Sequence, residues 1–182
     1  MKYVAWSIVV SLLLGLSGCV PSLHELYSEK DLIFEPRLLG EWVEAKPDSK
    51  STLIFTKSGD KEYKMVSTDQ ADKFSFVAHL VKLGDKLFLD ISGDSSVDCH
   101  TLALPVHMFF LVSQFEPTLR MRDFSDDWLK EYLKGNPAAL KHDIVDKDLV
   151  VTASTTELQR FVLGHLNTKG AFAEAVDYMR KK

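Results

Sequence analysis

The stretch FSFVAHLVKLGDKLFLDI, residues 74–91, decides the fold of this chain. It holds two apolar segments of strand length joined by Gly84-Asp85, a two-residue link with glycine in first place. Glycine accepts the positive φ that the first position of a type II′ turn demands. The stretch therefore predicts a tight antiparallel hairpin of strands 74–83 and 86–91.

The first of these strands is apolar on both of its faces, and segment 105–115 has the same pattern. One face of strand 74–83 carries Phe74, Phe76, Ala78 and Leu80, and the other carries Val77, Val81 and Leu83. A strand that is apolar on both faces must be covered on both. We therefore expect one face to line a barrel interior and the other to lie beneath helices around Trp128 and Phe161. The interior is either filled by its own side chains or holds an apolar ligand.

Outward from the hairpin, further β-strands are separated by short turn sequences. They are predicted at residues 41–45, 52–57 and 62–67 before the hairpin, and at 105–115 and 118–124 after it. Seven strands with mostly short links describe an antiparallel meander. A return strand at 149–153 would allow closure into a barrel or a strongly curled sheet, which removes exposed strand edges.

Helical patterns begin only after the seventh strand. Ser125 is placed to cap a helix that ends at Gly135-Asn136-Pro137. The capping-box spacing of Ser154-Thr155-Thr156-Glu157 opens a second helix, and the apolar spacing of residues 171–179 predicts a third. The predicted fold class is therefore α+β, mainly antiparallel β, with a curled meander or barrel of about eight strands and two or three helices near the C-terminus.

The segment Gly40-Glu41-Trp42 resembles the opening of lipocalins, in which a short turn precedes Gly-x-Trp on the first strand. The resemblance implies a lipocalin-like barrel with Trp42 plugging one end. It also implies that an arginine late in the barrel stacks on this tryptophan by cation–π attraction, with Arg120 and Arg122 as the candidates. The alternative is that Trp42 is simply a core aromatic residue.

The amino terminus has the pattern of an export signal. Lys2 precedes an apolar run at residues 4–16, which is shorter than the roughly 20 residues that a bilayer span needs. Leu16-Ser17-Gly18-Cys19 follows and resembles the bacterial lipobox. The resemblance implies cleavage before Cys19 and a diacylglyceryl thioether, with fatty chains such as palmitate, on its sulfur.

This interpretation divides the chain into a signal peptide at 1–18, a lipidated tether at 19–34 and a single β-rich domain at 35–182. The tether either lays its apolar side chains against the domain or leaves them mobile. These side chains are Leu23, Leu26 and Tyr27. Two or more acyl chains hold a protein firmly on a bilayer without a spanning helix. Val20 stands where enteric bacteria place an aspartate to retain a lipoprotein in the inner membrane, so in a cell with two membranes we expect an outer-membrane position facing the periplasm.

The composition and the number of cysteines limit which partners and which covalent links we expect. The formal net charge is −4 and 46% of the residues are apolar, as in a mildly acidic globular protein. Nucleic acid is not expected as a partner, because phosphate binding needs a basic face. Once Cys19 carries lipid, Cys99 is the one thiol that remains, so no intramolecular disulfide is expected. Neighbouring residues of an extended segment point to opposite sides, so His100 is not expected to activate this thiol, and a free thiol is favoured over an activated nucleophile.

The six histidines have no metal-ligand spacing. His79 and His107 both lie in strands that otherwise have core composition. If these strands are neighbours, the two imidazoles converge with Asp90 on one site, as a metal cluster or an acid–base pair requires. An isolated, hydrogen-bonded histidine in each strand is the alternative. The sequence shows no stronger catalytic constellation, so neither a catalytic residue, a metal nor a cofactor is expected.

The mature chain is also similar to uncharacterised bacterial lipoproteins in segments 39–42, 87–90 and 149–154, a likeness that implies the same address and architecture. We therefore expect a non-catalytic, lipid-anchored cell-envelope protein that binds an envelope protein or a small apolar ligand. One alternative is a scaffold whose exposed helices dock on a larger envelope complex. Another is a hydrolase that uses Asp90, His79 and His107.

Overall fold

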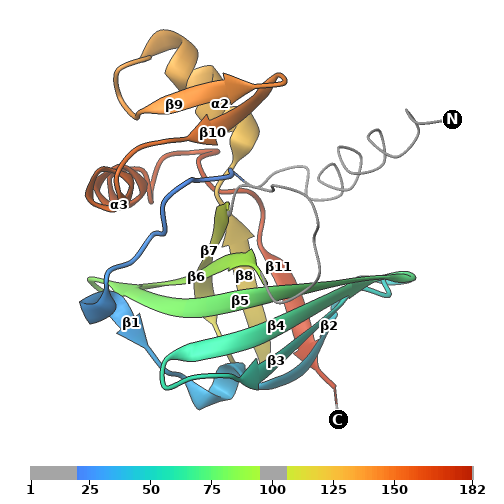
Figure 1. Ribbon diagram of the computed structural model, residues 1–182. Helices are drawn as coiled ribbons and strands as arrows, with labels where there is room; N and C mark the ends of the chain where they lie inside the picture. The colour runs from blue at the N-terminus through green and yellow to red at the C-terminus, as the bar shows by residue number, and fades with distance from the viewer. Residues whose placement is uncertain (1–19, 95–105, 182) are drawn as a thin grey trace, which may run out of the picture.

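The structure, a computed structural model, describes residues 20–94 and 106–181 (Figure 1). Eight antiparallel strands of this part of the chain close into a barrel in the order β5-β4-β3-β2-β11-β8-β7-β6, with β6 pairing back onto β5. They are β2 (Gly40–Glu44), β3 (Thr52–Lys57), β4 (Glu62–Asp69), β5 (Asp72–Leu83), β6 (Lys86–Gly93), β7 (His107–Gln114), β8 (Thr118–Asp123) and β11 (Val176–Arg180). The predicted mainly antiparallel, lipocalin-like barrel is confirmed.

The hairpin predicted at residues 74–91 is present. β5 and β6 pair from Phe76 with Gly93 down to Leu83 with Lys86. Gly84 adopts a φ of 62°, as the first position of a type II′ turn requires. The seven strands predicted before the first helix are all confirmed, with ends that differ by one or two residues.

The strand that closes the barrel was predicted wrongly. Residues 149–153 contribute β10 (Asp148–Val151), which pairs with β9 (His142–Val145) in a separate two-stranded sheet. Closure comes instead from β11, in the segment where a third helix was predicted at 171–179. β11 pairs with β2 on one side and β8 on the other, so the backbone groups of both edges are satisfied. That tertiary gain outweighs a weak helical pattern.

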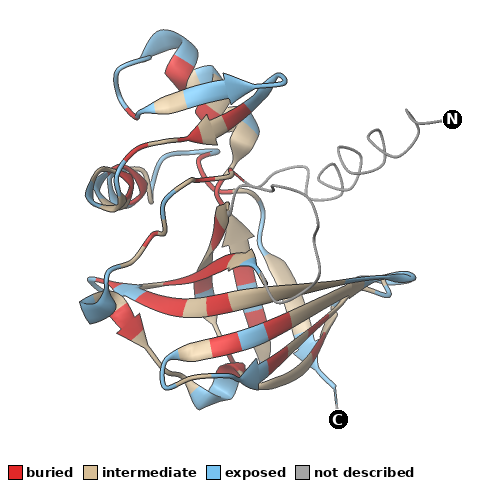
Figure 2. Cartoon of the chain, viewed as in Figure 1, coloured by how far each residue is buried: buried red, intermediate tan, exposed pale blue. Residues whose placement is uncertain are grey.

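The barrel interior is filled by its own side chains. Along each strand, alternate residues point inward and pack into one apolar cluster, an alternation that Figure 2 shows along the barrel wall. Its buried members on the strands are Trp42, Leu53, Phe55, Tyr63, Met65, Ala78, Leu80, Leu89, Ile91, Met108, Val112, Leu119 and Met121. Burial of each large apolar side chain contributes about 1.5–3 kcal/mol, so this packing is a main source of stability.

A second apolar cluster lies between the outer wall of the barrel and the helices. Val81, Phe88 and Phe109 point outward from β5, β6 and β7 and pack with α2 (Asp126–Gly135) and α3 (Thr155–Gly164). The expectation that one face of these strands lies beneath helices is confirmed. The predicted caps are also present: the Ser125 hydroxyl accepts from the Trp128 N–H, and Ser154 forms a capping box with Glu157.

Trp42 closes one end of the barrel. The ring is fully buried, and its Nε1–H donates to the Leu38 carbonyl at 2.9 Å. The Arg180 guanidinium lies 4.2 Å from the ring centroid and donates to the Leu39 carbonyl at 2.6 Å. Gly40 has a φ of 119°, and a Cβ there would lie 2.7 Å from Arg180 Nη1. The glycine of Gly-x-Trp therefore makes room for the arginine that covers the tryptophan.

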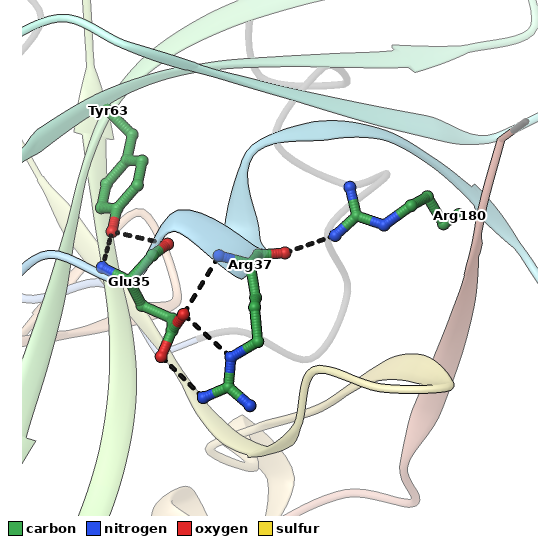
Figure 3. Close-up of polar contacts among 4 residues, drawn as sticks. All are labelled: Glu35, Arg37, Tyr63 and Arg180. Carbon is green, nitrogen blue, oxygen red and sulfur yellow. Dashed lines mark hydrogen bonds and ion pairs between the residues drawn. The ribbon is translucent and has the colours of Figure 1, made fainter.

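The same arginine holds the 3₁₀ helix η3 (Pro36–Leu38) against this end (Figure 3). It donates to the Arg37 carbonyl at 2.5 Å. Glu35 caps the helix by accepting from the Arg37 N–H and forms an ion pair with the Arg37 guanidinium at 2.7 Å. The Tyr63 hydroxyl accepts from the Glu35 N–H at 2.6 Å, which ties the segment to the barrel wall.

The choice of Arg120 and Arg122 as partners of the tryptophan was wrong. Arg120 forms a two-bonded ion pair with Asp177, both at 2.7 Å. Arg122 donates to the Phe172 carbonyl at 3.0 Å and lies over the Phe172 ring. Arg180 was missed because its segment was predicted as a helix rather than as the closing strand.

The segment before η3 packs against the domain. Val20, Leu26 and Leu32 are buried in the outer apolar cluster. Strand β1 (Leu32–Ile33) pairs with the end of β5 beside the barrel. Of the two alternatives for this segment, the structure shows the one in which it lies on the domain. Within residues 20–94 and 106–181, no helix is long and apolar enough to cross a membrane.

Candidate functional site

Three neighbouring strands bring His79, Asp90 and His107 together on the outer wall of the barrel. His79 of β5 lies directly opposite Asp90 of β6, and His107 of β7 lies opposite Ser92. β5 and β7 do not pair with each other, but β6 lies between them, and the convergence considered as one of the two alternatives is the arrangement found. Part of this geometry follows from the turn, because a two-residue link at 84–85 sets the register that pairs position 79 with position 90.

Asp90 is the centre of the site. The residue is 1% exposed, and Oδ1 lies 2.7 Å from His107 Nδ1. Oδ2 accepts from the Leu26 N–H at 2.8 Å. An ionised carboxylate only accepts hydrogen bonds, so when Asp90 is ionised Nδ1 of His107 carries a proton, and in the neutral imidazole the opposite ring nitrogen, Nε2, then accepts. Both carboxylate oxygens are thus satisfied, as a buried charge requires.

Residues 20–31, hereafter the N-terminal strap, cover this site. Ser22 exchanges two backbone hydrogen bonds with His107, at 2.9 and 2.8 Å. The Tyr27 ring lies over His79, with centroids 4.7 Å apart. On its other side the strap meets α3, where Gln159 donates to the Leu26 carbonyl at 2.9 Å. Sequence analysis did not place these residues in the site, because the strap has no periodicity that marks its contacts.

The environments of the titratable groups differ. Burial alone would lower the pKa of His107, but the hydrogen bond and charge of Asp90 outweigh it and raise the pKa above 6.5. Burial lowers the pKa of His79 and raises that of Asp90. Burial, followed by the charge of Asp90, raises the pKa of Tyr27 to about 12. Two neighbouring imidazoles with opposite shifts are the arrangement that acid–base chemistry uses.

The chemistry that the site allows is proton transfer through an oriented imidazole. Asp90 orients His107 as the carboxylate of an acid–base dyad does. The side chains of His79 and His107 are each 15% exposed, so access from solvent is narrow. Glu62 lies 3.8 Å from His79 Nε2. Among residues 20–94 and 106–181, no three His, Cys, Asp or Glu side chains are arranged to hold a metal ion.

The other residues singled out in the sequence are not part of this cluster. Cys19, Cys99 and His100 lie outside the described residues. His142 and His165 donate from Nδ1 to carbonyls near in sequence, those of Leu140 and Phe161, each at 2.8 Å. These two are isolated, hydrogen-bonded histidines of the kind weighed as the alternative.

Two surface hollows are lined by described residues, and both lie outside the barrel interior. The larger, of about 520 Å³, lies between the β2–β3 and β4–β5 loops at the end opposite Trp42. It is lined by Asp48, Ser49, Lys50, Asp69, Gln70 and Ala71. The smaller, of about 330 Å³, lies beside α3 and includes Lys141 and Arg160. Both are open to solvent, unlike the enclosed cavities that bury most of a small apolar ligand.

Comparison of the chain with protein-family models, with curated proteins and with solved structures gave no match.

Proposed function

We propose that this protein is a non-catalytic, lipid-anchored component of the cell envelope that acts as a binding module for another envelope protein. The observation that carries the proposal is the position of the lipobox. Cys19 stands directly before Val20, which is 2% exposed and packed in the outer cluster. A lipid on Cys19 attaches to the folded body without a linker, and two or more acyl chains hold such a body firmly. Without an aspartate at position 20, the expected location in a cell with two membranes is the periplasmic face of the outer membrane.

A filled barrel favours a macromolecular partner over a small apolar ligand. The interior side chains pack on each other and leave the loops and outer wall as the surfaces that another molecule can reach. A scaffold that docks by its helices is less favoured. The exposed large apolar side chains of the described residues are Ile144, Val145, Leu163 and Met179, and Leu163 alone of these lies on a helix. A docking helix would carry a larger patch.

The anchor is tested by replacing the sulfur that would carry it. Cys19→Ser should release the protein from membranes and leave the precursor uncleaved, whereas Cys99→Ser should leave both unchanged. Mass spectrometry of the mature amino-terminal peptide should find a diacylated cysteine. A mature chain that begins elsewhere, or that carries no fatty chains, would overturn the proposal. Crosslinking of the native protein, followed by mass spectrometry, identifies the partner.

A second candidate function rests on the geometry of the histidine site. The 2.7 Å contact of Asp90 with His107, with His79 alongside, favours a hydrolase that uses these three residues. Asp90→Asn and His107→Gln should then abolish a hydrolytic activity of the purified protein, while Asp177→Asn, at an exposed ion pair, should preserve it. If the wild-type protein hydrolyses none of the ester, amide and phosphoester substrates tested, the hydrolase function is ruled out.

A further inference from the structure

The direction in which the chain leaves the folded body points to a second membrane contact. Ser22 forms a parallel bridge with Val151 of β10. Leu23 donates to the Val151 carbonyl and Val151 donates to the Pro21 carbonyl, both at 2.9 Å. The strap therefore runs in the same direction as β10. Followed backward from Ser22, it heads toward the start of β10 and the turn of the β9–β10 hairpin (Figure 1).

Chain length then limits how far the lipid can lie from this hairpin. Cys19 precedes Ser22 by three residues, which span at most about 10 Å. The same number of residues leads along β10 from Val151 back to Asp148, where the strand leaves the turn. A lipid on Cys19 is thus held at the end of the molecule that carries the hairpin turn.

The last two residues of β9, directly before that turn, are the most exposed large apolar side chains of the described residues. Ile144 is 62% exposed and Val145 is 54% exposed. They pair with Leu149 and Asp148 next to the turn. Successive residues of a strand point to opposite faces, so Ile144 and Val145 place one exposed aliphatic side chain on each face of the hairpin, beside the charged turn residues Asp146 and Lys147. A flat protein partner would cover one face, whereas immersion in a fluid interface covers both.

We propose that the end of the β9–β10 hairpin, with Ile144 and Val145, is immersed in the bilayer to which the lipid on Cys19 attaches. The inference rests on the proposed lipid anchor. It gives the barrel two points of contact with the membrane, so the protein has one orientation instead of turning about a single tether. The loops at 45–51 and 70–71 are then held at a fixed distance from the membrane surface and in a fixed orientation to it.

The charges around the turn indicate whether the hairpin prefers anionic or zwitterionic lipid headgroups. Lys141 and Lys147 are offset by three acidic residues, Asp143, Asp146 and Asp148. Because the hairpin carries no excess of positive charge, attraction to anionic headgroups is not what holds it. The contact is apolar, and we expect it on zwitterionic vesicles with little dependence on salt.

The test measures how deep single residues lie in a membrane. Mature, lipidated protein is purified in a Cys99→Ser background and reconstituted in phosphatidylcholine–phosphatidylethanolamine vesicles. A nitrobenzoxadiazole label is attached at Ile144→Cys, at Val145→Cys or, as the matched control, at Met179→Cys. Met179 is 53% exposed and lies on β11 beside Arg180, near the Trp42 end of the barrel. The thioether on Cys19 keeps that sulfur unlabelled.

Nitroxide-labelled lipids should quench the labels at 144 and 145 by about twofold or more, as expected for residues that enter the interfacial zone. The label at 179 should be unaffected. Equal quenching at all three positions, or quenching at 144 or 145 alone, would overturn the immersed hairpin while the lipid anchor stands. Absence of lipid on Cys19, found by mass spectrometry of the same preparation, would overturn the anchor and the hairpin contact with it.

Discussion

Replacing Asp90 tests whether the histidine site holds the N-terminal strap on the barrel. Asp90→Ala removes the acceptor of the Leu26 N–H and of His107 Nδ1, both within 2.8 Å of the carboxylate. Each buried donor left without a partner costs about 1–3 kcal/mol. Relief of the buried charge offsets part of this, so we expect the free energy of unfolding to fall by about 3 kcal/mol, at the low end for a broken buried pair.

Asp90→Asn separates charge from shape. The amide keeps one acceptor oxygen and loses the charge, so the expected loss is smaller, about 1–2 kcal/mol. The charge and hydrogen bond of Asp90 outweigh burial in the wild type and raise the pKa of His107. Without them burial dominates, and the pKa of His107 should drop below its ordinary value of 6.5.

The measurements are urea unfolding followed by tryptophan fluorescence, titration of the His107 ring protons by NMR, and hydrogen exchange of the Leu26 amide. Asp177→Ala is the matched control, because its carboxylate is also held by two short hydrogen bonds, to Arg120, but is exposed to solvent. It should leave stability nearly unchanged. An Asp90→Ala protein as stable as the wild type, with an unchanged Leu26 exchange rate, would refute the role assigned to the site.

Two further predictions concern the closed end and the strap. Arg180→Ala should lower the free energy of unfolding by about 2 kcal/mol and expose Trp42 to iodide quenching, with Arg180→Lys intermediate because lysine cannot bond two carbonyls in a fixed fork. Burial raises the pKa of Tyr27 from 10.0 to about 12, so its stabilising contribution is complete below pH 10 and lost as the pH rises through 12. Unfolding of Tyr27→Phe between pH 9 and 12 should therefore depend less on pH than that of the wild type.

Several features of the fold could be predicted because their causes are local. The turn at Gly84-Asp85 could be predicted because glycine accepts a positive φ. The helix caps at Ser125 and Ser154 could be predicted because a serine hydroxyl accepts from the unpaired N–H groups of the first helical turn. The two-sided apolar pattern of residues 74–83 indicated cover on both faces, which the interior and the helices supply. Each of these depends on residues within a few positions of one another.

Only part of the histidine site could be predicted from the sequence. The tight turn places His79 opposite Asp90, and apolar residues on both faces mark both histidine strands as buried. The strap contact could not be predicted, because Leu26 meets Asp90 across 64 positions of chain and nothing in residues 20–31 encodes that approach. Burial of Asp90 follows from this cover rather than from its own strand.

By itself, the amino-acid sequence determined the seven strands before the first helix, the turn at Gly84-Asp85 and the two helix caps, since each depends on a short pattern of side chains. The tertiary structure alone decided that β11 closes the barrel, that Arg180 covers Trp42 and that the strap seals Asp90. Closure satisfies the backbone hydrogen bonds of two edges at once. The free energy gained from these hydrogen bonds exists only when segments distant in the sequence meet. A local pattern of side chains therefore cannot predict it.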